Sequence, residues 1–213
     1  MLDLEEIWEY REESIYPSIF GDLGEGIFPL SADIFTQQFK ATCDPRWLHY
    51  GIFQSPPNEK RSSWLYVSSG MSNPWEQENK EKISGYGVEF ILETHTKSMW
   101  AIQVLQNMVA YNTLLVHGHF GEKSPLDYGD RIPLNQSISP DYESDLRNLL
   151  IAEPANIKTQ FELASGKVDF LLFIGTSDDE IIYAKENGSA ELLELLKERE
   201  VYPYTDPRRE SVV

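Results

Sequence analysis

Two histidines, His117 and His119, have the spacing in this chain that is most suggestive of chemistry. One residue separates them, so on a strand both imidazoles would point to the same face, and the acids Glu122, Asp127 and Asp130 follow closely. Two imidazoles and one carboxylate could hold a metal ion. No His-Glu-x-x-His helix accompanies them, and the chain has only four histidines in all. We therefore expect no metal and interpret the pair as polar residues that end a helix, with a metal-dependent hydrolase as the alternative.

Other catalytic signatures are missing from the sequence. The dipeptide Gly166-Lys167 resembles part of a phosphate loop, but Phe161 stands where the first glycine is needed and Val168 replaces the magnesium-binding hydroxyl. No serine lies in a Gly-x-Ser-x-Gly elbow. The single cysteine, Cys43, allows no internal disulfide and no cysteine metal cage, and it is typical of a small core residue. The sequence predicts a protein that is not an enzyme and carries no cofactor.

The charge of the chain restricts its partners. It has 18 Lys and Arg against 35 Asp and Glu, a formal net charge of −17. Such a chain repels nucleic acid and anionic membranes, so neither is expected as a partner, whereas a basic protein would be attracted. An acidic surface can equally serve solubility alone, and both interpretations stay open.

Acidic residues are concentrated near both ends of the chain. Residues 1–26 hold eight acids and one base, a net of −7, and residues 177–213 hold ten acids and five bases, a net of −5. Chain ends often lie close together, so the two segments could form one negative face. Candidate protein-binding residues on it are Glu5, Glu9, Glu12 and Glu13. The alternative is that these acids only solvate amphipathic helices.

The composition predicts one globular domain over residues 1–213. The chain is 41% hydrophobic and 12% aromatic, which is enough to build a core. Its start, Met1 to Glu6, is acidic where a signal peptide would be basic and then apolar, and no apolar run approaches the ~18 residues that span a bilayer. We expect a cytoplasmic protein. The sequence does not indicate an oligomeric state.

The elements that must position any site follow from hydrophobic periodicity. Helices are expected over the first 20 residues and over 31–39, 99–116, 177–187 and from Ser189 onward. A Ser177–Glu180 capping box is expected to open the helix over 177–187, and Ser189 is expected to cap the last helix. Strands are expected over 48–55, 63–68, 86–96, 146–152, 158–163 and 168–174, the last of them central because it is almost continuously apolar. Interspersed strands and helices predict an α/β fold of the α+β kind, a mixed sheet flanked by helices.

One strand carries an unusual glycine–acid pattern. Gly85 and Gly87 enter the strand, so a bulge or a close backbone approach is expected there. Glu89 lies between apolar neighbours and faces solvent if the strand is half-buried. If it is buried, it needs a partner, for which Arg131 is the residue we propose from the sequence.

These motifs together resemble bacterial members of the Suppressor of fused domain family. The residues that carry the resemblance are 64–72, 84–90, 128–134, 174–180 and 202–208, and it spans about residues 45–210. The resemblance implies a mixed sheet flanked by helices, no enzymatic activity and no cofactor. Animal relatives restrain a transcription factor of the Hedgehog pathway by means of a second, C-terminal domain, and bacterial relatives are regarded as immunity proteins that neutralise toxins.

The functional prediction is a non-enzymatic protein-binding module whose specific form is an immunity-type inhibitor of a basic toxin. The alternatives are the metal-dependent hydrolase built on His117 and His119, and a general interaction adaptor unrelated to toxins.

Overall fold

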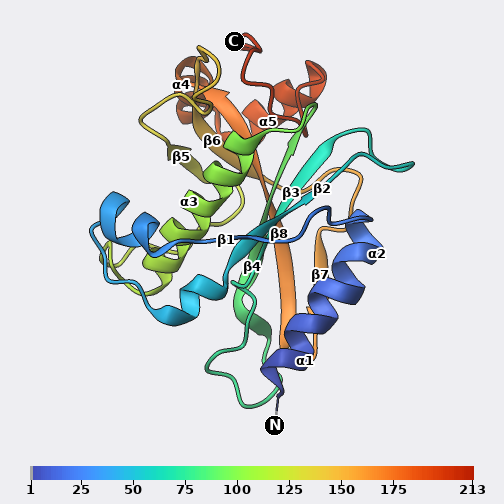
Figure 1. Cartoon of the computed structure of the whole chain (residues 1–213). Helices are drawn as coiled ribbons and strands as arrows, with labels where there is room; N and C mark the ends of the chain where they lie inside the picture. Colours follow the sequence, from blue (N-terminus) through green and yellow to red (C-terminus); the bar gives the residue numbers. More distant parts are fainter. Residues whose placement is uncertain (1) are drawn as a thin grey trace.

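A mixed β-sheet runs through the middle of the molecule, and helices cover both of its faces (Figure 1). The computed structural model describes residues 2–213, and Met1 lies outside them. The strand order is β1-β2-β3-β4-β8-β6-β5, β7 also pairs with β8, and within residues 2–213 only β4 and β8 run parallel. The strands are β1 Phe28–Pro29, β2 Gly51–Ser55, β3 Trp64–Ser69, β4 Ile83–Thr94, β5 Arg131–Pro133, β6 Leu146–Ala152, β7 Gln160–Leu163 and β8 Gly166–Ser177. The α+β architecture predicted from the sequence is confirmed.

Strand β8 is the central strand that its apolar run predicts. It pairs with β4, β6 and β7. Its side chains alternate between two cores, with Leu171 and Phe173 in one and Phe170 and Leu172 in the other. All four are fully buried, which a strand covered by helices on both faces requires.

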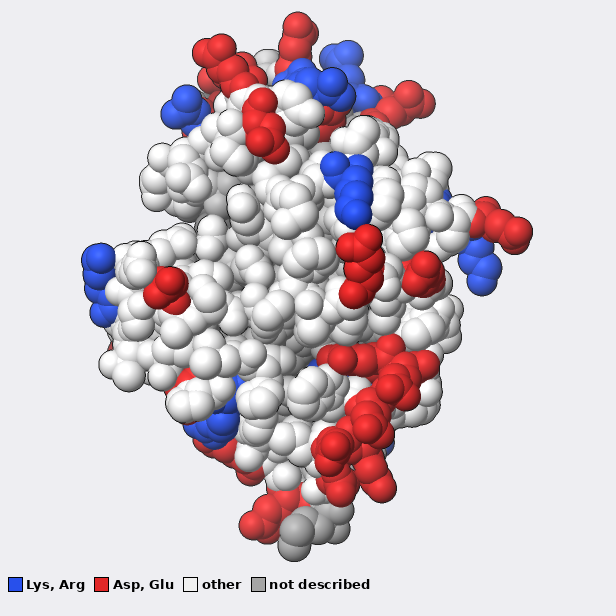
Figure 2. Space-filling model, viewed as in Figure 1, with Lys and Arg blue, Asp and Glu red and all other residues white. Residues whose placement is uncertain are grey.

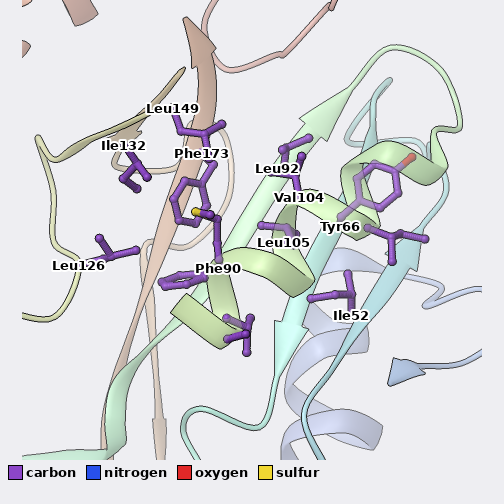
Figure 3. Close-up of a cluster of buried hydrophobic side chains, with 14 of the residues drawn as sticks. Ile52, Tyr66, Phe90, Leu92, Val104, Leu105, Leu126, Ile132, Leu149 and Phe173 are labelled. Carbon is purple, nitrogen blue, oxygen red and sulfur yellow. The ribbon is translucent and has the colours of Figure 1, made fainter. Parts of the chain in front are cut away.

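Helix α3, Met99–Val116, covers the first face with the bounds that its periodicity predicts. Figure 3 shows Val104 and Leu105 of this helix against Leu92 of β4, with Phe90 and Phe173 nearby. The rings of Phe90 and Phe173 meet edge to face at 4.8 Å. The helix is buried so broadly because it packs against β2, β3 and β4 and is also contacted by η2.

The N-terminal helix covers the other face in three continuous parts, α1 Leu4–Glu9, η1 Tyr10–Ile15 and α2 Tyr16–Phe20. The helix predicted over the first 20 residues is confirmed, but η1 is a π turn, which adds a residue to the helical turn. The fully buried positions therefore include both Arg11 and Tyr16. Arg11 follows the buried Ile7 by four residues and so points into the protein, and the π turn brings Tyr16, five residues further on, to the same face.

The remaining helices are η2 Ile34–Gln38, η3 Pro45–His49, α4 Asp178–Asn187 and α5 Ser189–Glu198. The capping box of α4 is confirmed, since Ser177 Oγ accepts from the Glu180 amide at 3.2 Å and Glu180 Oε2 accepts from the Ser177 amide at 2.9 Å. The predicted cap of α5 is wrong, because Gly188 is the N-cap and the Ser189 hydroxyl donates to the Gly129 carbonyl.

The strand expected over residues 48–55 begins later than predicted, at Gly51. Asp44 and Pro45 start the helical turn η3 before it, because the Asp44 side chain accepts from the Arg46 amide and proline favours the first helical position. The difference matters because η3 forms one wall of the site described next. Among residues 2–213, no helix has the length and apolar character needed to cross a bilayer.

Candidate functional site

A pocket of about 390 Å³ opens between η3, the loop that follows β3, the first residues of β4 and the end of α3. That volume is typical of a binding site rather than a packing defect. Five of the thirteen residues that line it carry aromatic rings, and they come from four separate segments of the chain: Trp47, Tyr50, Trp75, Tyr86 and His117.

The loop after β3 is held against β4 by two glycines. Gly70 and Gly85 adopt φ values of +128° and +55°, which other residues rarely adopt. A Cβ on Gly85 would lie 2.5 Å from the Met71 carbonyl, and the Tyr86 amide donates to that carbonyl at 2.8 Å. The bulge or close approach predicted for Gly85 and Gly87 is confirmed, since the β4–β8 register shifts between Ile83 and Val88.

Glu89 anchors this loop from below. Its side chain is fully buried, and Oε1 accepts from the Gly70 amide at 3.0 Å, the Ser72 amide at 2.9 Å and the Ser72 hydroxyl at 2.7 Å. Oε2 accepts from the Ser68 hydroxyl. The proposed partner Arg131 is wrong, because Arg131 is exposed on β5 and neutral donors of the loop surround the carboxyl group instead.

Arg11 ties the N-terminal helix to the same loop. Its guanidinium is 1% exposed and donates through Nη1 to the Ser72 hydroxyl at 3.0 Å and to Asn73 Oδ1 at 2.6 Å. Nη2 pairs with Glu12 at 3.2 Å, and Glu12 also accepts from the Ser69 hydroxyl. Hydrogen bonds and an ion pair therefore connect the acidic helix directly to the wall of the pocket.

The aromatic groups contact one another across the pocket. The Trp47 and His117 rings lie 5.1 Å apart, and the rings of Tyr50 and Tyr86 meet edge to face at 6.3 Å. The Tyr86 hydroxyl lies 3.0 Å from His117 Nε2, and the Tyr50 hydroxyl donates to the Tyr86 hydroxyl at 3.4 Å. Burial raises the pKa of both tyrosines, so their hydroxyls stay protonated at neutral pH.

Charged groups lie at the edge of the pocket. Arg46 contacts Asp44 at 2.7 Å and Glu76 at 3.4 Å, and Glu81 also lines the pocket. The hydrogen bonds from Arg46 lower the pKa of Asp44. Deeper in the wall, Asn73 is 2% exposed, and its Nδ2 has no hydrogen-bond partner among residues 2–213. An unpaired amide N–H is suited to donate a hydrogen bond to a ligand oxygen.

The metal hypothesis requires His117 and His119 to lie on a strand, and they do not. They follow the last turn of α3, where His117 is the C-cap residue. The His117 ring bonds Tyr86, and the His119 ring packs at 4.9 Å against Phe120. Within residues 2–213, no group of three or more His, Cys, Asp or Glu side chains could hold a metal ion. The geometry supports the interpretation made from the sequence, that these are polar residues that end the helix, and not the alternative of a metal-dependent hydrolase.

The acidic candidates separate into two kinds. Glu5, Glu9 and Glu13 are exposed, whereas Glu12 is half-buried against the sheet. Figure 2 shows a band of acids over the N-terminal helix and a broad uncharged area beside it. The chain ends do not meet as expected, because the N- and C-termini lie at opposite ends of the molecule (Figure 1). The two acidic segments therefore do not merge into one face.

The acidic helix nevertheless lies next to the pocket. The Trp8 ring of α1 contacts His49 at 5.9 Å, and His49 contacts Trp75 at 5.8 Å. The Leu2 amide donates to the Glu78 carbonyl of the pocket loop at 3.3 Å. Sequence reasoning missed the pocket, although a tryptophan at position 75 within a charged loop was a signal, since a large aromatic side chain in such a loop commonly serves binding.

Comparisons with known proteins agree with this fold. The model of the family described as Suppressor of fused protein (SUFU) matches residues 46–210. The solved structure of the Sufu–Fu complex is 21% identical, with a TM-score of 0.62, over 87% of this chain and 93% of that one. Drosophila Suppressor of Fused is 20% identical, with a TM-score of 0.62, over 88% of this chain and 52% of that one.

A SUFU homologue from Neisseria gonorrhoeae FA 1090 is also similar, at 19% identity and a TM-score of 0.55, over 77% of this chain and 78% of that one. The comparison with curated protein sequences gives no match. At these identities the solved structures support the fold, and the family match rests on the sequence itself.

Proposed function

The chain belongs to the Suppressor of fused family, and we propose that it acts as a non-enzymatic protein-binding module that contacts its partner through the aromatic pocket and the acidic helix beside it. One solved relative was crystallised as a complex of Sufu with Fu, which supports a binding role for this fold.

The pocket is the observation that carries this proposal. Its aromatic wall is continued outward by exposed aliphatic side chains, since Ile83 is 42% exposed and Val116 is 37% exposed. Leu48, between two aromatic residues of η3, is 40% exposed. Apolar side chains grouped around an aromatic pocket are typical of protein interfaces, in which a few such residues contribute most of the binding energy.

The acidic band suggests the kind of partner. Glu5, Glu9 and Glu13 point to solvent on a chain of net charge −17, so a cationic protein would be steered toward this side of the molecule. A basic toxin neutralised in the cytoplasm is the specific partner that we propose. An adaptor that binds another basic protein is the alternative, and the identity of the captured partner distinguishes the two.

A matched pair of variants tests the proposal. The partner is captured from the native organism and purified, and its affinity for Ile83→Ala is compared with its affinity for Ile182→Ala. Ile182 is 53% exposed on α4, outside the pocket, so both variants remove a similar exposed aliphatic group. We expect Ile83→Ala to weaken binding about tenfold and Ile182→Ala to leave it unchanged. Equal affinities would overturn the proposed interface.

Replacing Glu5, Glu9 and Glu13 together by Gln tests the acidic band separately. Glu12 is left intact because it holds Arg11. The association rate should fall several-fold, and its dependence on salt should flatten, while the dissociation rate changes little. An association rate insensitive to both salt and the substitutions would exclude the helix as a steering surface.

A further inference from the structure

The pocket combines aromatic faces with an excess of negative charge. Trp75 and Tyr86 are partly exposed and form its open side, while Trp47 and Tyr50 are buried at its base. Aromatic faces attract cations because of their quadrupole, and tryptophan does so most strongly.

The charges at the edge of the pocket also favour a cation. Asp44, Glu76 and Glu81 carry three negative charges, and Arg46 carries one positive charge, which gives a net of −2. Arg46 is held mainly by Asp44, since it lies 2.7 Å from that residue and 3.4 Å from Glu76. Glu76 remains 80% exposed, so it can receive a second cation.

The lysines of the pocket loop do not cancel this charge. Lys80 pairs with Glu162 of β7, and Lys80 and Lys82 line a different hollow. The loop therefore presents Glu76 and Glu81 toward the aromatic pocket and Lys80 and Lys82 toward the hollow beside β7.

The unpaired Asn73 Nδ2 indicates what accompanies the cation. Its Oδ1 is taken by Arg11 at 2.6 Å, which fixes the direction of the amide. Asn73 lines the pocket, and its nitrogen is a buried donor without a partner within residues 2–213. A peptide carbonyl is an acceptor that could satisfy it.

We propose that the pocket binds an arginine side chain presented by an extended segment of the partner. The guanidinium would lie against Trp75 and Tyr86 and meet Glu76 and Glu81, and a carbonyl of the same segment would accept from Asn73. A planar guanidinium suits this site better than an ammonium, because it stacks on rings and bonds carboxylates at the same time. This inference rests on the proposed protein-binding function and specifies its chemistry.

A pair of isosteric peptides tests the inference. Acetyl-Gly-Arg-Gly-amide and the same peptide with citrulline, which is neutral and of the same shape, are titrated into the intact chain. The side-chain N–H signals of the five tryptophans are followed by NMR and assigned with Trp→Phe variants. The arginine peptide should shift the Trp75 and Trp47 signals and bind at least about fivefold more tightly than the citrulline peptide.

Trp64 and Trp100 serve as internal controls. Trp64 lies outside the pocket, and the Lys97 ammonium already occupies the face of its ring at 5.6 Å. Trp100 is only 2% exposed, so a peptide cannot reach it. Their signals should not move. Glu81→Gln should weaken the arginine peptide several-fold, and Glu186→Gln, an exposed acid on α4, should not.

Equal binding of the two peptides, shifts confined to Trp64 or Trp100, or the absence of any saturable shift would overturn the inference. The proposed function fails by a different result, namely partner binding that is unaffected by Ile83→Ala. A partner that requires Ile83 while the arginine peptide does not bind would leave the interface in place and reject arginine as its ligand.

Discussion

Glu89 and Glu93 lie four residues apart on β4, and both are almost completely buried, yet their hydrogen-bond partners differ in number and kind. Glu89 accepts hydrogen bonds from two backbone amides and two hydroxyls. Glu93 accepts one side-chain hydrogen bond, from the Ser63 hydroxyl, and its Oε1 has no partner within residues 2–213. Burial raises the pKa of Glu93 in spite of that bond.

The comparison shows that burial alone does not define the role of a carboxyl group. The loop over residues 70–73 folds around Glu89, so hydrogen bonds to this carboxyl group fix the conformation of one wall of the pocket. Glu93 shapes no loop, and its environment opposes ionisation. Three substitutions test this distinction.

The largest effect is expected for Glu89→Ala. The change leaves the Gly70 and Ser72 amides and two hydroxyls buried without their acceptor. We expect the free energy of unfolding to fall by about 3–5 kcal/mol, measured by urea denaturation. The variant should also lose affinity for the arginine peptide, because Asn73 belongs to this loop and Trp75 follows it. A loss below about 1 kcal/mol would show that the loop is held by other contacts.

Glu89→Gln sharpens the comparison because it keeps the size of the side chain. One amide oxygen can still accept, but the new NH₂ group faces either backbone donors or the Ser68 hydroxyl. We expect a loss of about 2 kcal/mol, between wild type and Glu89→Ala. Stability equal to wild type would mean that the charge of Glu89 contributes nothing.

The smallest effect, and one of opposite sign, is expected for Glu93→Gln. A raised pKa means that the folded protein keeps the Glu93 proton to a higher pH than the unfolded chain does. Stability is therefore lost as pH rises from the ordinary pKa of glutamate through the folded value. The variant removes this loss and keeps an acceptor for Ser63.

Glu93→Gln should accordingly be more stable than wild type at about pH 8, by less than about 1 kcal/mol, and the difference should vanish at about pH 4. Thermal unfolding at both pH values measures it. A variant that is less stable than wild type at the higher pH would contradict the proposed cost of ionisation.

Much of the fold could be predicted from local patterns. The run from Val168 to Ile174 predicted a strand with two buried faces, and the broad apolar stripe over 99–116 predicted a helix packed on a sheet. The capping box at Ser177 and Glu180 was visible because its residues lie three apart in sequence. The cap at Ser189 was not, because its hydroxyl bonds the distant Gly129 carbonyl instead.

The candidate site could be predicted only in part. Glu5, Glu9 and Glu13 are exposed, as an acidic amphipathic helix requires, but Glu12 is half-buried, because it pairs with the buried Arg11 and accepts from the Ser69 hydroxyl. Ser69 lies 57 residues from Glu12 along the chain, so this contact leaves no signal in composition or spacing. The same holds for the partners of Glu89, which lie 17 to 21 residues away along the chain.

The sequence by itself determined the mixed sheet, its central strand, the helix that covers it, the negative charge and the family. These depend on periodicity, composition and short motifs, which are properties of neighbouring residues. Tertiary structure alone decided that Trp47, Trp75, Tyr86 and His117 surround one pocket, and that the chain ends lie apart. Residues from four segments meet there because η3, the loop after β3, the start of β4 and the end of α3 come together, and no local pattern encodes such a meeting of distant segments.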